Sequence, residues 1–326
     1  MTGTIASLPA VQAAVHSAWS FPAFAPALAF IAPSVFWPYL DGAVVLAVGL
    51  FVIFKYENQR APGAEKLLNF GPLLFAIPMA VFGTEHFTAT AGIAQIVPSW
   101  MPAHLFWTYL VGTCLLAAAL SLAANQRAGL AAALLGLMLF LFVLMIHIPN
   151  FAAHPSRFTL AVLLRDLSLS GAALAFAGTK SETWREHRRH VFITLGRFFI
   201  AVPAVFFGVE SILHPDYVPS IPLNRVTPSW IPGHVLWTYV AGAVLILGGL
   251  SLLANRKARL AALCMGLVVL LTVLFVYLPI EAAALSDIGN GLNFFADTLA
   301  YGGGLLLLAQ ALAPEAAEIV IVASSG

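Results

Sequence analysis

The chain has 326 residues, of which 61% are hydrophobic and 9% are charged, and its formal net charge at pH 7 is +1. A soluble globular domain carries about 25% charged residues, and the mean hydropathy of this chain is +0.93. This composition excludes a soluble globular protein and indicates a chain that lies in a membrane.

Continuously apolar runs dominate the sequence, each close to the roughly 20 residues that an α-helix needs to cross about 30 Å of hydrocarbon. Unbroken runs indicate helices, because the strands of a membrane barrel alternate polar and apolar residues. The runs cover residues 36–55, 71–90, 104–124, 128–148, 158–178, 195–214, 233–254, 259–280 and 292–312. We therefore predict an all-α membrane protein with about nine transmembrane helices.

Residues 1–66 hold the first of these helices and an apolar segment before it. Pro9, Pro22 and Pro26 interrupt that segment, and proline breaks the interior of a helix. We expect this segment to lie at the membrane interface, ahead of one complete transmembrane helix.

The distribution of basic residues predicts the orientation, because cytoplasmic loops are enriched in Lys and Arg. If the N-terminus lies outside, twelve of the 15 Lys and Arg residues fall in inner loops. Only Arg157 and Arg225 then lie outside, and Arg165 lies within a helix. We predict an outside N-terminus and a cytoplasmic C-terminus.

The sequence repeats itself at an offset of about 130 residues. Three pairs of segments carry the match: VPSWMPAHLFWTYLVG (97–112) with TPSWIPGHVLWTYVAG (227–242), GPLLFAIPMAVFGTEHF (71–87) with GRFFIAVPAVFFGVESI (196–212), and SLAANQRAGLAAALLGL (121–137) with SLLANRKARLAALCMGL (251–267). Each copy has four helices, and an even number makes both copies enter the membrane in the same direction. We predict two parallel four-helix bundles, residues 67–180 and 195–326, joined by a basic cytoplasmic linker at 181–194.

These motifs resemble the DoxX family of bacterial membrane proteins, in two copies and over about 240 residues. The shared features are an opening glycine, the P.W.P loop, Tyr109 with Gly112, a tight basic turn, and Asp166 with Gly171. The resemblance implies a bacterial cytoplasmic membrane protein linked to quinol oxidation, thiosulfate oxidation or another membrane redox system. The chain differs from the family in its duplication and its additional first helix.

Ionisable residues within the helices are candidates for function, because each costs about 2.5 to 3.5 kcal/mol in hydrocarbon. They gather within about 12 Å of the outer membrane face at 1.5 Å per residue. The predicted catalytic residues are Glu85, His104, His147 and Asp166, and the predicted ligand-binding residues are His86, Trp107, Tyr109, Arg165, Glu210, His234 and Asp297. The first bundle is the favoured one, because its His86, His147 and Arg165 are replaced by Ser211, Tyr277 and Ala296 in the second.

Several interpretations of this cluster stay open. The polar groups can simply hydrogen-bond one another and fix the bundle, or they can bind a quinone between aromatic walls and exchange protons with it. Haem or metal ligation by His86, His104 and His147 is less favoured, because helical His pairs four residues apart are missing; we predict no metal site. Trp107 and Tyr109 also suit an aromatic belt at the membrane interface.

The expected partners are membrane lipids, a quinone and a redox partner subunit. A non-catalytic assembly partner, with glycines that permit close helix packing, and a small-molecule transporter are the alternatives from other functional classes. The sequence contains no phosphate-binding loop, serine elbow, HExxH motif or nucleic-acid-binding patch. Cys114 and Cys264 each lie alone in an apolar run, which indicates packing residues.

Overall fold

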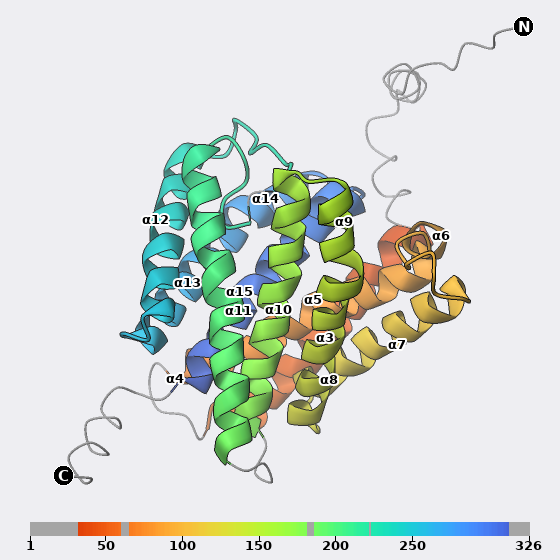
Figure 1. Cartoon of the computed structure of the whole chain (residues 1–326), viewed down its shortest axis with the longest axis horizontal. Coiled ribbons are helices and arrows are strands. Elements are labelled where there is room, and N and C mark those ends of the chain that lie inside the picture. The colour runs from red at the N-terminus through yellow and green to blue at the C-terminus, as the bar shows by residue number, and fades with distance from the viewer. Residues whose placement is uncertain (1–31, 60–64, 181–185, 222, 313–326) are drawn as a thin grey trace, which may run out of the picture.

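The structure of the chain is a computed structural model that describes residues 32–59, 65–180, 186–221 and 223–312 (Figure 1). The predicted interfacial segment up to residue 31, residues 181–185 of the predicted linker and the tail from residue 313 lie outside the described residues. The described remainder of the linker belongs to a transmembrane helix, α11.

Nine helices among the described residues are long and apolar enough to cross a membrane. Their main helices are α3 (Pro33–Val52), α5 (Gly71–Thr88), α7 (His104–Ala123), α8 (Ala128–Phe142), α10 (Arg157–Lys180), α11 (Glu186–Leu213), α12 (His234–Leu253), α13 (Ala258–Thr272) and α15 (Asn293–Ala311). The spans that begin with α3, α8 and α13 continue to Glu57, Ala153 and Ala283. The shorter helices are α4 (Glu65–Leu68), α6 (Thr90–Ile93), α9 (Ile148–Ala153), α14 (Leu278–Ala283) and the π-helical turns η1 (Ile53–Glu57), η2 (Val143–His147), η3 (Val273–Tyr277) and η4 (Ile288–Leu292). The predicted fold class, an all-α integral membrane protein, is confirmed.

The two repeats share backbone features as well as sequence. In each, a fifteen-residue helix, α8 or α13, continues into a π turn and then into a short helix that begins with a proline in its first turn. The turns before α8 and α13 also match, because Asn125 and Arg127 adopt the same left-handed conformation (φ 51°) as Asn255 and Lys257. The duplication therefore extends to backbone conformation.

At the centre of the protein, helices of one repeat pack on helices of the other. The first helix of each repeat packs on the last helix of the other: α5 on α15, and α11 on α10. Glycines permit this approach, since a Cβ at Gly71 would lie 3.1 Å from Leu306 Cβ and one at Gly196 would lie 2.4 Å from the carbonyl oxygen of Gly171. α10 and α15 also pack on each other, so the eight helices form one continuous assembly.

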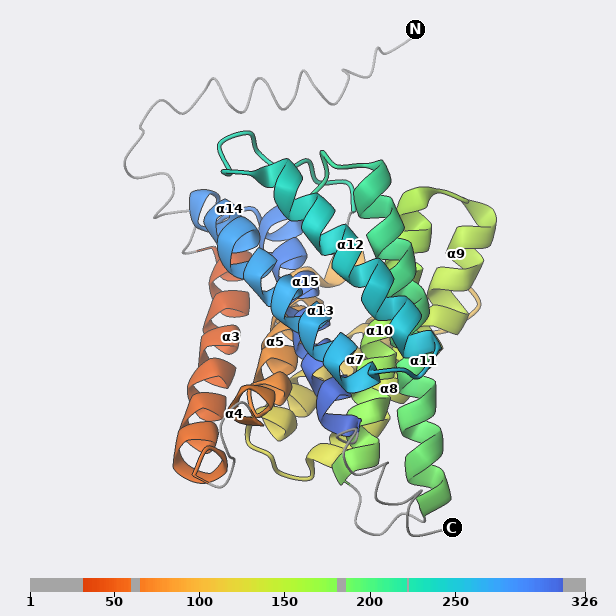
Figure 2. The same ribbon diagram turned by 90° about the vertical axis from the view of Figure 1, so that its left-hand side faces the viewer.

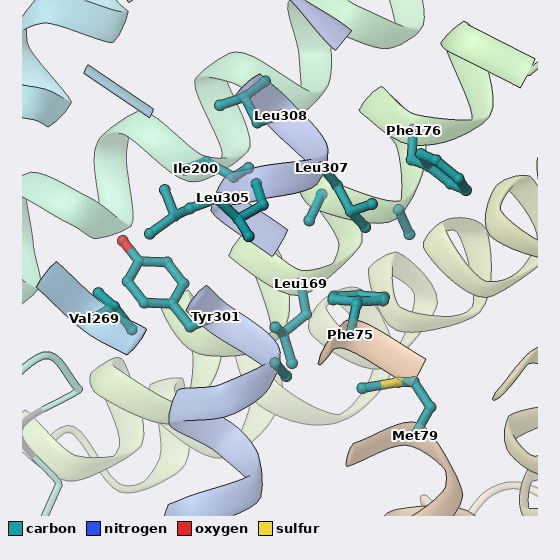
Figure 3. Packing of buried hydrophobic residues seen from close by; sticks show 14 of the residues in the cluster. Phe75, Met79, Leu169, Phe176, Ile200, Val269, Tyr301, Leu305, Leu307 and Leu308 are labelled. Carbon is teal, nitrogen blue, oxygen red and sulfur yellow. The ribbon is translucent and has the colours of Figure 1, made fainter. Parts of the chain in front are cut away.

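The core lies where α5, α10, α11 and α15 meet. Phe75, Leu169, Ile200 and Leu305 from these four helices pack together there (Figure 3). α15 is the most enclosed span, with 83% of its most apolar stretch buried, against 28% for α3. α3 lies at the edge of the assembly (Figure 2), where its Asp41 accepts a hydrogen bond from Thr84 of α5 at 2.5 Å.

The close crossing of α10 and α11 predicts a destabilising effect of Gly196→Ala. The added methyl group would meet the Gly171 carbonyl oxygen, and such overpacking typically costs about 1 to 3 kcal/mol. We expect a lower free energy of unfolding in a denaturing-detergent titration. Gly92→Ala is the matched control, because nothing lies within 4 Å of a Cβ at that position. Equal stability of the two variants would contradict the packing described.

Candidate functional site

Arg165 joins the two aspartates that occupy equivalent positions in the repeats. From α10, its Nε and Nη2 both lie 2.9 Å from Asp166 Oδ1, and its Nη1 donates to Asp297 Oδ2 of α15 at 2.7 Å. Both aspartates are buried. The position equivalent to Arg165 is Ala296, so two buried carboxyl groups share one guanidinium where α10 and α15 meet.

His147 extends this network to a third element. Its Nε2 lies 2.7 Å from Asp166 Oδ2, and because a carboxylate accepts hydrogen bonds, Nε2 is the donor. His147 is the last residue of the π turn η2, a distortion that is frequent at functional sites. The described network therefore runs from His147 through Asp166 and Arg165 to Asp297.

Glu85 and His86 lie near the end of α5, next to this network. Oε1 of Glu85 is buried and has no hydrogen-bond partner, while Asn293 of α15 approaches the same carboxyl group. Nδ1 of His86 lies 2.7 Å from the carbonyl oxygen of Phe82, so it is the donor and Nε2 is left as the acceptor in the neutral ring. Glu85 thus has an unused acceptor, unlike the members of the Arg165 network.

These residues line one side of a cavity of about 580 Å³. Its polar side is formed by α5, η2, α10 and α15, through Glu85, His86, His147, Arg165, Asp166, Asn293 and Asp297. The other walls are largely apolar and come from α7, α8 and the connecting segment 93–101. Small-molecule pockets are typically about 300 to 1,000 Å³ and apolar, with few convergent polar groups. The cavity matches that description.

The structure brings together seven of the eleven predicted site residues around this cavity: Glu85, His86, Trp107, His147, Arg165, Asp166 and Asp297. Asp297 belongs to the second repeat, yet it reaches the cavity of the first because α15 packs on α5 and α10.

Four predicted residues lie elsewhere. His104 is the first residue of α7 and does not line the cavity. Tyr109 is exposed, and its ring stacks on that of Phe87 with the ring centroids 5.6 Å apart. Glu210 forms an ion pair in which its Oε2 lies 3.5 Å from Nη1 of Arg157. Nδ1 of His234 lies 3.3 Å from the carbonyl oxygen of Ile231.

The corresponding region of the second repeat is filled by the connection between α11 and α12. Val218, Ile221 and Leu223 of this connection are buried. Ser220 Oγ lies 2.9 Å from Thr272 Oγ1, and the Tyr277 hydroxyl donates to the carbonyl oxygen of Pro219 at 2.7 Å. Thr272 and Tyr277 are the counterparts of Phe142 and His147, which line the cavity of the first repeat. The first repeat is therefore hollow where the second is packed.

The sequence interpretation missed Asn293 and the sulfur-containing residues of the cavity wall. Met79, Met101, Met138 and Met145 all line it, whereas the second repeat contains Met265 as its one methionine. Methionine is unbranched and adapts to irregular spaces. This uneven distribution was a signal in the sequence that could have located the cavity walls.

Among the described residues, no three His, Cys, Asp or Glu side chains are grouped so that they could hold a metal ion. Comparison with protein-family models, with curated proteins and with solved structures finds no match to the chain. The resemblance to the DoxX family therefore stays a prediction from the sequence motifs.

The shared guanidinium predicts a specific pattern of stability changes. Arg165→Met should destabilise the protein by about 3 to 5 kcal/mol, as removing one partner of a buried ion pair usually does. Adding Asp297→Asn should restore part of the loss, because one uncompensated carboxylate is removed. A double-mutant cycle in a denaturing-detergent titration measures the coupling. Additive effects of the two substitutions would contradict the shared pairing.

Proposed function

We propose that the chain binds a quinone or quinol in the cavity of the first repeat and exchanges protons with it, as one component of a membrane redox system. The redox partner subunit in this proposal is a separate protein. The DoxX resemblance supports the redox context, and the polar side of an otherwise apolar cavity supports the class of ligand. The proposed location is the bacterial cytoplasmic membrane, with the cavity in its outer half.

The unpartnered Oε1 of Glu85 is the observation that carries this proposal. A buried carboxylate oxygen without a hydrogen bond is costly, and a ligand hydroxyl in the cavity would satisfy it. A quinol has such a hydroxyl on a flat apolar ring. The mostly apolar walls, which include the ring of Trp107, suit the rest of that molecule.

The other polar residues have distinct roles in this proposal. A bound quinol supplies two electrons and two protons when it is oxidised. Glu85 accepts one hydroxyl proton, and the free Nε2 of His86 is a second acceptor on the same helix. Asp166 orients His147 by accepting its Nε2–H, and Arg165 holds Asp166 in place. The electrons pass to the redox partner subunit.

The Arg165 network favours a positioning role over direct proton exchange. Its members satisfy one another across η2, α10 and α15, and interhelical hydrogen bonds stabilise membrane proteins. The interpretation that polar contacts fix the bundle therefore applies to these residues. It does not account for Glu85, whose Oε1 is buried without a hydrogen-bond partner.

Replacement of Glu85 tests the proposal. We expect Glu85→Gln to weaken binding of a decyl-substituted benzoquinol by about 10- to 100-fold, the loss of one hydrogen bond to a charged group at 1.4 kcal/mol per tenfold. Binding would be measured by equilibrium titration of the purified protein in detergent. Glu210→Gln is the matched control in the second repeat, because Glu210 does not line the cavity, and it should bind normally.

Two results would contradict the proposal. One is unchanged affinity in folded Glu85→Gln protein, and the other is the absence of benzoquinone and benzoquinol binding to the unmodified chain. Isolation of the protein in a stable complex without any quinone would instead support the alternative of a non-catalytic assembly partner.

A further inference from the structure

We propose that the ligand carries a long hydrocarbon tail and reaches the cavity sideways from the lipid, through an opening between α7 and α8. This inference rests on the proposed function and deepens it. It names a membrane-resident amphiphile, with its polar ring inside and its tail in the bilayer, as the class of ligand.

Four described residues belong to the cavity wall and to the outer surface at once: Ile96 on the connecting segment, which is 56% exposed, and three residues on the transmembrane helices α7 and α8. Leu110 and Cys114 lie one turn apart on α7, and Leu141 lies on α8; all three line the cavity. Leu110 is 40% and Leu141 41% exposed, and Cys114 is also exposed. A residue with both properties marks the rim of an opening. Because the three positions on α7 and α8 lie within transmembrane helices, the opening faces lipid.

The arrangement of the two helices explains the opening. A short turn joins α7 to α8, and from it α7 leans away from α8 (Figure 1). Of the consecutive spans within either repeat, these two pack on each other least extensively. The diverging helices leave the cavity accessible between them.

The second repeat shows how the same place is closed. Trp237 of α12 and Phe275 of η3 stack there with ring centroids 5.7 Å apart and an interplanar angle of 19°. Their counterparts in the first repeat are Trp107 and Met145, which line the cavity. A flexible thioether side chain thus replaces the second ring of the stack, and methionine adapts its shape easily.

The chemistry of the rim selects the ligand. Its leucine side chains offer no hydrogen bond to a hydrated or charged molecule as it passes, and the thiol of Cys114 offers only a weak one. A ring with a hydrocarbon tail keeps the tail in lipid while its polar oxygens reach Glu85 and His86. The same rim disfavours a water-soluble ligand of similar ring size.

Closing the opening tests this inference. Met145→Phe recreates the aromatic stack of the second repeat, and Phe275→Met is the reciprocal control outside the cavity. Protein in nanodiscs would be mixed with a decyl-substituted benzoquinone, which partitions rapidly into the nanodisc bilayer, and quenching of tryptophan fluorescence would report its arrival in the cavity. We expect Met145→Phe to slow association at least about tenfold, within the range over which association rates vary among variants, and Phe275→Met to leave it unchanged.

A second pair of variants keeps the test independent of one substitution. Cys114→Phe narrows the rim, whereas Cys264→Phe places the same ring on the exposed surface of α13. Slower association of the quinone with the Cys114→Phe variant, and unchanged association with the Cys264→Phe variant, supports lateral access. Normal association in both Met145→Phe and Cys114→Phe, with quinone binding intact, overturns lateral access and leaves the proposed function standing. Absence of quinone binding to the unmodified chain overturns both.

Discussion

The packing of the two repeats depends on a single guanidinium, that of Arg165, which lies between two buried carboxyl groups. Charged groups in hydrocarbon are expensive and need partners, and the buried Asp166 and Asp297 meet this need together through Arg165. Since the aspartates come from equivalent helices of the two repeats, the requirement draws α10 and α15 together. That contact places each terminal helix against the opening helix of the other repeat, so the repeats form one body with a shared core.

The same constraint makes the duplication unequal. An arginine stands in α10 and an alanine at the equivalent place in α15, so the polar network lies in the first repeat and incorporates Asp297 from the second. Around it the walls of the first repeat stay open, while in the second repeat Ser220 and Pro219 contact Thr272 and Tyr277. We interpret the second repeat as the support that supplies one side chain and half of the core, and the first as the ligand-binding unit.

The sequence predicted much of the fold because hydrophobicity and length determine it. Each of the nine predicted apolar runs overlaps one membrane-spanning helix, and the repeat was evident from the PSW segments. The position of the polar residues along each helix could also be predicted from the sequence. Glu85, His147 and Asp166 were expected near one end of their helices, and all three line the cavity.

Orientation around each helix axis, and the choice of packing partner, were not accessible. Tyr109 lies on the face of α7 opposite the cavity-lining Val111, whereas His104 shares the face of Val111 but is the first residue of α7 and does not line the cavity. The packing of α5 on α15 and of α11 on α10 depends on glycine contacts, such as that between Gly196 and Gly171. The sequence alone does not tell whether such glycines contact a helix of their own repeat or of the other one. The filling of the second repeat depends on a connecting segment whose buried residues, such as Val218 and Ile221, lie outside any periodic pattern.

The cavity lies in the first repeat, and we propose that this repeat alone binds the ligand. Photoaffinity labelling with an azido-substituted quinone, followed by mass-spectrometric mapping of the modified peptides, tests this claim directly. We expect modification of α5, α7, α8 and η2, together with the first turns of α15. Equal labelling of α12 and α13, or labelling spread over the lipid-facing surface without saturation, would contradict it.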